Sequence, residues 1–237
     1  MHFRPGSRIL CKSRCPGSAG REFTVTTAAP IRLAGAELAE TWHVCAFFNS
    51  DEEEYRVLLP FIKDGFACGE RAFHVVNPDR REDHLQRLAA AGIDLRAAEQ
   101  RGQFELSNNR EWYLPEGSFN PDRVLAEYDQ LATRNTQDGF LRTRIITHMD
   151  WAIGCGACLD DIAELESRIN EPSRRRRNAA ICIYPLAKLS GATVIDAMRT
   201  HPVIIIGGIL HQNPFFVPPE DFLPELRRRR ARAPTAP

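Results

Sequence analysis

Apolar and polar positions along the chain first predict a strand and then a helix. Residues 43–48 (HVCAFF) form an apolar run, and after Asn49 and Ser50 apolar residues recur at helical spacing as far as Phe66. Short uninterrupted apolar runs are typical of strands buried in a parallel sheet. Ser50 and Glu53 have the spacing of a capping box, and the acidic residues 51–54 suit the positive end of a helix dipole. This pair is the first folded unit that the pattern indicates.

The strand-then-helix pattern repeats along the rest of the sequence. We expect helices that begin at Asn77-Pro78 and Asn120-Pro121, helices around residues 162–169 and 194–198, and strands at residues 72–76, 104–106, 144–148, 180–184 and 203–210. Alternation at this spacing predicts an α/β fold, a three-layer, mostly parallel sheet with helices on both faces. Ligands of such sheets bind beyond the carboxyl ends of the strands, so the candidate pocket lies there.

Composition indicates one globular domain with tails. The chain has 237 residues, of which 43% are hydrophobic and 26% charged. The longest apolar run, residues 203–210, contains Gly207 and Gly208 and is far shorter than the roughly 20 residues of a membrane helix. Seven scattered cysteines and the absence of an apolar signal segment at the amino terminus favour free thiols and a cytoplasmic location.

Charge is distributed unevenly although the formal net charge is zero. Residues 1–32 hold six basic residues and one acid, and five arginines follow Glu225, which leaves 20 basic and 30 acidic residues in the body. A body with a net charge of −10 is not expected to bind nucleic acid, which requires Lys and Arg at phosphates. We expect a disordered basic leader at 1–32, a folded domain at 33–226 and a disordered Arg-rich tail at 227–237.

The loop after the first strand excludes an ordinary P-loop enzyme. A phosphate-binding loop needs glycines, a lysine and a hydroxyl, whereas residues 49–55 read NSDEEEY. Four consecutive acids would repel a triphosphate, and charge neutralisation is a large part of phosphoryl-transfer catalysis. We therefore expect no ATP hydrolysis and no nucleotide cofactor.

Two further segments carry candidate chemistry. THMDWA, at residues 147–152, puts His148, Asp150 and Trp151 after a strand, either as ligand contacts or as packed residues held by backbone hydrogen bonds. Cys155 and Cys158 form a CxxC that lacks the second pair of a structural zinc site, and the histidines have no regular metal spacing. We expect no metal, with Cys155 and Cys158 as weak candidates.

Several strings resemble the MEDS family, the methanogen/methylotroph sensory domain, over residues 33–228. They are HVCAFFNSDEEEYRVLLPFIKDGFACGERAFHVVNPDRREDHLQRL, THMDWA, ICIYPLAKLSGATVIDAMRTHPVIIIGG and QNPFFVPPEDFLPELR. The resemblance implies a RecA/KaiC-like fold without a P-loop and without enzymatic activity. It also implies sensing of simple hydrocarbon derivatives in prokaryotic signalling, beside helix-turn-helix or histidine-kinase modules.

The resemblance also implies a set of ligand-binding residues around the strand ends. They are His43, Phe47, Glu54, Tyr55, His74, His148, Asp150, Trp151, Tyr184, Asn213 and Phe215. We read the chain as a stand-alone sensor of a small organic molecule, with a histidine kinase or transcription regulator as protein partner and possible homo-oligomers. Three alternatives stay open: an enzyme with His148 as base, a nucleotide-binding regulator without hydrolysis, and an interaction scaffold.

Overall fold

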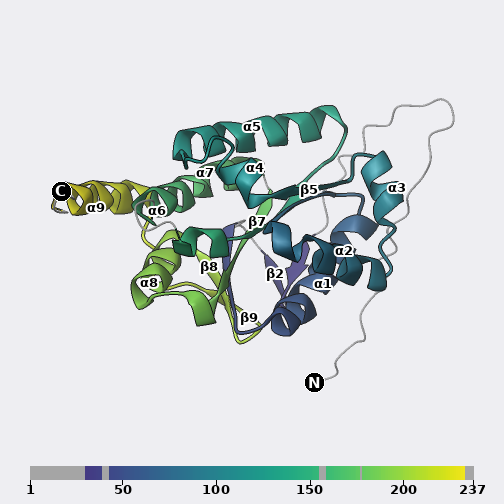
Figure 1. Ribbon diagram of the computed structural model, residues 1–237, viewed down its shortest axis with the longest axis horizontal. Helices are drawn as coiled ribbons and strands as arrows, with labels where there is room; N and C mark the ends of the chain where they lie inside the picture. Colours follow the sequence, from purple (N-terminus) through teal and green to yellow (C-terminus); the bar gives the residue numbers. More distant parts are fainter. Residues whose placement is uncertain (1–29, 39–42, 155–158, 177, 233–237) are drawn as a thin grey trace, which may run out of the picture.

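The centre of the fold is a seven-stranded sheet (Figure 1). The computed structural model describes residues 30–38, 43–154, 159–176 and 178–232. Neighbouring strands of this sheet are parallel except for the last pair, and their order is β5-β4-β6-β7-β3-β8-β9. The bounds are β3 His43–Phe48, β4 Arg71–Val76, β5 Phe104–Asn108, β6 Thr143–His148, β7 Ala179–Pro185, β8 Val203–Ile206 and β9 Ile209–Gln212. The predicted mostly parallel α/β sheet is confirmed.

Helices cover both faces of the sheet, which gives the predicted three layers (Figure 1). On the first face lie α1 (Asp51–Ala67), α2 (Arg81–Ala90) and α3 (Leu95–Gln100), with a hairpin of β1 (Ile31–Leu33) and β2 (Ala36–Leu38). The second face carries α4 (Asn109–Tyr113), α5 (Pro121–Gln137), α6 (Leu159–Arg168), α7 (Asn170–Arg176) and α8 (Gly191–Thr200). Helix α9 (Pro219–Arg232) packs on α6. Short 3-10 turns follow three strands: η1 (Pro78–Arg80), η2 (Asp150–Gly154) and η4 (Leu186–Lys188).

The predicted start of α1 is confirmed in atomic detail. The Ser50 hydroxyl accepts a hydrogen bond from the backbone N–H of Glu53 at 3.2 Å. The Glu53 carboxylate returns to the backbone N–H of Asn49 at 2.9 Å, one residue before the capping residue. The acidic residues of the first turn are therefore accounted for as helix-starting residues.

Side chains of each central strand alternate between two separate cores. Val44, Ala46 and Phe48 of β3 pack on the α1 side, whereas Cys45 and Phe47 pack on the α5, α6 and α8 side. The alternation follows from the pleat, which points successive side chains to opposite faces. Two residues adjacent in a strand therefore cannot share one pocket inside the layers.

The last predicted strand, residues 203–210, is instead a hairpin. Strands β8 and β9 pair antiparallel, with Ile206 opposite Ile209. Gly207 and Gly208 form the turn with φ values of 60° and 75°, the two positive φ angles that a two-residue hairpin requires. An apolar run with two central glycines was read as one buried strand, but the glycines reverse the chain.

The expected disorder of the Arg-rich tail is wrong for residues 227–232, which continue α9. Phe222 and Leu226 of this helix are buried, and Arg229 and Arg230 pair with four acids of α6 and α8, namely Asp160, Asp161, Glu164 and Asp196. The acidic body supplies these partners. Residues 31 and 32 of the expected leader belong to β1, and residues 1–29 and 233–237 lie outside the described part. Within the described ranges, no helix is long and apolar enough to cross a bilayer.

Candidate functional site

A polar cleft of about 310 Å³ lies where the sequence predicted a pocket, at the carboxyl ends of β3, β6 and β7. Its lining includes two cations, and both are paired with carboxylates. Arg80 lies 2.8 Å from Asp51 and 3.2 Å from Glu54, and Lys188 lies 3.5 Å from Asp150. With Asp79 the lining holds four acids against two paired cations. Such a cleft repels anionic phosphates.

Beneath this cleft, His148 is paired with Glu54. The His148 Nε2 and Glu54 Oε1 atoms are 2.8 Å apart, and His148 Nδ1 lies 3.4 Å from the Val75 carbonyl oxygen. Burial raises the pKa of Glu54, but His148 and Arg80 outweigh it, so that the pKa lies below its usual value. Both His148 nitrogens have partners and the residue is buried, so it is not poised as a base.

A chain of three buried side chains continues on the same face. The Tyr55 hydroxyl lies 2.7 Å from His84 Nδ1, and His84 Nε2 lies 2.9 Å from His74 Nδ1. Burial is the main reason that the pKa of His84 falls to about 3 and that the pKa of His74 falls well below 6.5. Neighbouring histidines lower both further. A neutral imidazole has one donor and one acceptor nitrogen, so His84 can donate a hydrogen bond to one of these two neighbours and accept one from the other.

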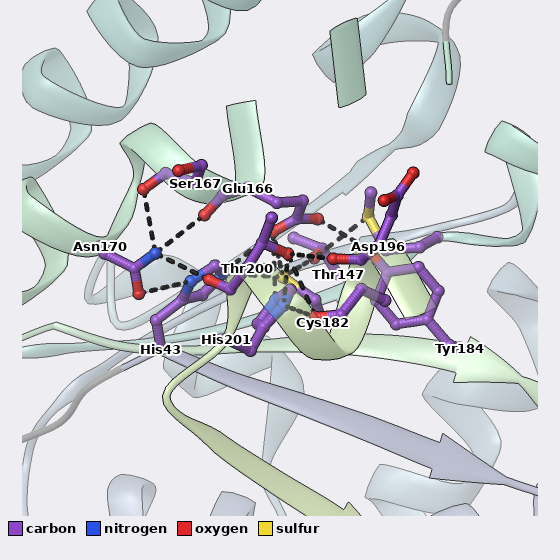
Figure 2. A network of polar contacts seen from close by, with 12 residues as sticks. His43, Thr147, Glu166, Ser167, Asn170, Cys182, Tyr184, Asp196, Thr200 and His201 are labelled. Atoms are coloured by element: carbon purple, nitrogen blue, oxygen red, sulfur yellow. Dashed lines mark hydrogen bonds and ion pairs between the residues drawn. The ribbon is translucent and has the colours of Figure 1, made fainter. Parts of the chain in front are cut away.

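A second cluster lies on the opposite face of the sheet (Figure 2). It consists of His43 at the start of β3, Cys182 of β7, Glu166 of α6 and His201 directly after α8, and we call it the buried cluster. All four side chains are buried. Their donor atoms lie within 4.8 Å of one another. The fold thus gathers four side chains of metal-ligating types, two histidines, one cysteine and one glutamate, from four separate segments.

Glu166 is the hub of the buried cluster. Its Oε2 lies 3.0 Å from His43 Nε2, 3.2 Å from His201 Nε2 and 3.4 Å from Cys182 Sγ. Its Oε1 accepts a hydrogen bond from the Tyr184 hydroxyl at 3.0 Å. Burial alone would raise the pKa of Glu166, but the two histidines outweigh burial and lower the pKa.

Burial also shifts the pKa values of His43 and Cys182 of the cluster and of the neighbouring Tyr184. Desolvation and then His201 lower the pKa of His43 to about 4, against the opposing effect of Glu166. Burial and then the Glu166 charge raise the pKa of the Cys182 thiol and of the Tyr184 hydroxyl. This concentration of perturbed groups marks the cluster as a functional-site candidate.

A small pocket of about 180 Å³ ends on the buried cluster. Its apolar lining comes from η2, α6 and α8 and consists of Ala152, Leu159, Ile162, Ala163, Ala192 and Ala197. Glu166 and Tyr184 line it beside the buried cluster, and Thr193 and Thr200 line it as well. Asp160 and Asp196 also line it, and Arg229 of α9 is paired with both. The pocket is mainly apolar with charged groups held in ion pairs.

The predicted ligand residues do not meet in one pocket, because the sheet separates them. Glu54, Tyr55, His74 and His148 lie on the α1 face. His43 and Tyr184 lie on the other face in or beside the buried cluster, and the Phe47 ring is 5.9 Å from that of Tyr184. The single pocket expected from the sequence is therefore corrected to two sites.

The remaining predicted residues are not members of either histidine cluster. Asp150 lines the cleft, and Trp151 stacks on Tyr113 with ring centroids 4.6 Å apart. The Asn213 amide donates to backbone carbonyls of Met198 and His201, so it braces the loop after α8. Phe215 is 60% exposed and borders an apolar groove with Ile195 and Met198. Cys155 and Cys158 lie outside the described residues.

Sequence reasoning missed Arg80, His84, Glu166, Cys182 and His201. For Glu166 a signal was present, since it follows Ile162 by four residues and so falls on the apolar face of α6. Cys182 precedes Tyr184 by two residues in β7, which puts both on one face. His84 and His201 had no comparable signal, because their partners come from distant segments.

Taken together, these features define an α/β domain with an acidic loop in place of a phosphate loop and a small pocket on a buried polar cluster. The chain belongs to the MEDS family, described as the methanogen/methylotroph, DcmR sensory domain, whose family model matches residues 42–202. It is thus a sensory domain, which assigns it to signalling or regulation.

Two individual proteins are similar to the chain. The transcriptional repressor DcmR of Methylorubrum extorquens is 22% identical over 184 residues, or 77% of this chain, and the chain spans 66% of that repressor's length. A KaiC-like protein of the archaeon Pyrococcus horikoshii matches 70% of this chain and 69% of its own, with 17% identity and a TM-score of 0.42.

Proposed function

We propose that this chain senses a small organic molecule, which it binds without transforming it in the pocket beside Glu166 and Tyr184. The observation that carries the proposal is the shape and chemistry of that pocket. Its volume of about 180 Å³ is below the range of roughly 300–1,000 Å³ that holds drug-sized ligands. The wall is alanine-rich, and its polar groups include the Glu166 carboxylate and the Tyr184 hydroxyl, while Asp160 and Asp196 are held by Arg229. This combination fits a short apolar molecule with one polar group.

The surroundings of the pocket favour a sensor over a catalyst. Tyr184, His43 and Cys182 all point to the same carboxylate of Glu166, so the polar groups partner one another. The base suggested by the sequence, His148, lies on the other face and pairs with Glu54 rather than with Asp150. These contacts support binding without turnover.

A nucleotide-binding regulator is less well supported. The cleft at the strand ends would be its site, yet Arg80 and Lys188 are already engaged by Asp51, Glu54 and Asp150. A bound phosphate would have to break these ion pairs beside four acids.

Helix α8 connects the proposed ligand pocket with the surface that a regulatory partner would contact. One side of α8 lines the pocket through Ala192 and Ala197, and another side exposes Ile195, which is 58% accessible. A ligand that favours one position of α8 would alter the surface seen by a regulatory partner. The similarity to a repressor supports a transcription regulator as that partner, with a histidine kinase as the alternative.

The test is a thermal-unfolding screen with short alcohols, halocarbons, amines and short carboxylic acids. A ligand at a hundred times its Kd stabilises the folded chain by about 2.7 kcal/mol, which is readily seen as a rise in Tm. We expect at least one class to raise Tm in a saturable way. Tyr184→Phe, which removes the hydroxyl at the polar end, should weaken that effect.

Tyr128→Phe is the matched control for the screen. Tyr128 is also buried on this face, but its hydroxyl is hydrogen-bonded to Ser173 at 2.9 Å and it does not line the pocket. Its response to the ligand should match that of the wild type. The proposal is abandoned if no class stabilises the protein, or if both tyrosine variants respond alike.

A further inference from the structure

Four potential metal-ligand atoms of the buried cluster converge on one point. His43 Nε2 lies 3.4 Å from Cys182 Sγ and 3.0 Å from Glu166 Oε2. Glu166 Oε2 lies 3.2 Å from His201 Nε2 and 3.4 Å from Cys182 Sγ. Figure 2 shows the side chains directed toward one another from separate strands and helices. These four separations are close to the ligand–ligand distances of a tetrahedral metal site.

The hydrogen bonds behind the rings fix which nitrogen of each histidine carries a proton. Asn170 Nδ2 donates to three backbone carbonyls, those of Glu166, Ser167 and Thr200, so its Oδ1 must be the atom that faces His43 Nδ1 at 3.2 Å. His43 Nδ1 therefore donates. His201 Nδ1 likewise faces the Ala197 carbonyl oxygen at 2.7 Å and donates to it.

With both Nδ1 atoms protonated, each neutral ring directs the lone pair of Nε2 at Glu166. Two lone pairs against a buried carboxylate repel one another. Protonation of one ring would leave the lone pair of the other Nε2 facing the carboxylate, and protonation of both would place two cations with ring centroids 4.0 Å apart in a site shielded from water. A metal cation between the Nε2 atoms removes this conflict. A metal-ligating histidine usually donates a hydrogen bond from its other ring nitrogen to a carbonyl or carboxylate oxygen, which fixes the tautomer and the orientation of the ring.

We propose that His43, Glu166, Cys182 and His201 bind one Zn²⁺ ion. Zinc–nitrogen and zinc–oxygen bonds of about 2.0–2.2 Å and zinc–sulfur bonds of about 2.3 Å give ligand separations of roughly 3.3–3.6 Å in a tetrahedron. Four of the six separations among the ligand atoms are 3.0–3.4 Å and need only a few tenths of an ångström of expansion. The other two, from His201 Nε2 to His43 Nε2 and to Cys182 Sγ, are within 4.8 Å. The proposal does not depend on the ligand-sensing function.

Charge and ligand type favour zinc over harder cations. One carboxylate and one thiolate neutralise a divalent ion, so the buried site would carry no net charge. Two imidazoles and a thiolate are softer donors than Mg²⁺ or Ca²⁺ select. Tyr184 holds the second carboxylate oxygen at 3.0 Å, which would orient Glu166 as a one-oxygen ligand.

The test uses the full chain, purified without added metal, then loaded with Zn²⁺ and dialysed against metal-free buffer. We expect one zinc per chain by elemental analysis and, after replacement by Co²⁺, a near-ultraviolet thiolate-to-cobalt band. Because Cys155 and Cys158 offer another possible thiolate pair, the same measurement is made on the Cys155→Ser, Cys158→Ser double variant. That variant should retain the metal and the band.

The matched comparison is between Cys182→Ala and Cys45→Ala, two cysteines that face each other in the β3–β7 register. Cys182→Ala should lose the cobalt band and bind zinc at least tenfold more weakly, whereas Cys45→Ala should keep both. Cys45 is the direct neighbour of Cys182 in the β3–β7 register and is equally buried, but is outside the four ligands. His201→Gln, checked for folding by circular dichroism, supplies a second ligand variant that leaves the thiolate in place and should weaken zinc binding at least as much.

Three results would overturn the proposal. One is a wild-type chain that retains no zinc after loading with micromolar Zn²⁺. Another is zinc binding that is unchanged by Cys182→Ala and His201→Gln. The last is loss of the metal from the Cys155→Ser, Cys158→Ser variant, which would place it at the CxxC segment.

Discussion

Low pH should destabilise the folded protein through His84 and His74, the buried neutral histidines that form a hydrogen-bonded chain with Tyr55. The folded protein protonates His84 only near pH 3, because burial and then His148 lower its pKa to about 3 from 6.5. An unfolded chain takes up this proton below about pH 6.5. Unfolding therefore becomes more favourable as pH falls from 6.5 toward 3, and the stability is fully present above 6.5.

The size of the effect follows from the two pKa values. Between about pH 7 and pH 5, protonation of His84 in the unfolded state alone lowers the free energy of unfolding by about 2 kcal/mol. His74, whose pKa is also lowered by burial and by His84, adds to this loss in the same direction. A loss of about 2 kcal/mol is a large share of a stability of roughly 5–15 kcal/mol.

The assay is urea unfolding at both pH values for the wild type and for His84→Gln, at constant ionic strength. Glutamine still reaches Tyr55 and His74 but does not titrate, so the variant should lose about 2 kcal/mol less than the wild type over the same pH interval. The quantity compared is the difference between the two proteins, because histidines distant from His84 cancel in it. Equal losses in the two proteins would refute the reasoning.

Three further substitutions test how much buried charge pairs and apolar packing contribute to the free energy of unfolding. Glu54→Gln leaves His148 and Arg80 without their buried carboxylate and should lower the free energy of unfolding by about 3 kcal/mol in urea titrations at neutral pH; a change below about 1 kcal/mol would contradict the buried pairing. Phe222→Ala should cost about 3 kcal/mol by creating a cavity under α9, whereas Arg229→Ala, which breaks half-exposed ion pairs, should cost less than about 1 kcal/mol. The reverse ranking would show that ion pairs, and not packing, hold α9.

The fold was readable from the sequence because its signals are local. The apolar run at residues 43–48 and the Ser50–Glu53 spacing specify a strand and a helix start without help from distant residues, and both are confirmed. The Gly207-Gly208 pair was equally local, but its meaning was missed inside an apolar run. The helical form of residues 227–232 depends on acids of α6 and α8, which no local pattern reveals.

Only part of the candidate site could be predicted from the sequence, because the rest depends on how the strands and helices pack. The carboxyl ends of the strands hold the polar cleft, and a family resemblance picked out His43 and Tyr184. Which face each side chain occupies depends on the pleat, and this is what separates His43 from His148. Glu166 and His201 meet through the packing of α6 against α8, so sequence spacing cannot bring them together.

Calorimetric titration of the best compound of the thermal screen tests the central claim, ligand binding beside Glu166, most directly. The protein is compared with Ala192→Phe, which fills the pocket from an exposed lining position, and with Ala90→Phe, an exposed helix position on the opposite face. The account predicts one binding site per chain in the wild type and in Ala90→Phe, and at least tenfold weaker binding in Ala192→Phe. Unchanged affinity in Ala192→Phe would contradict it.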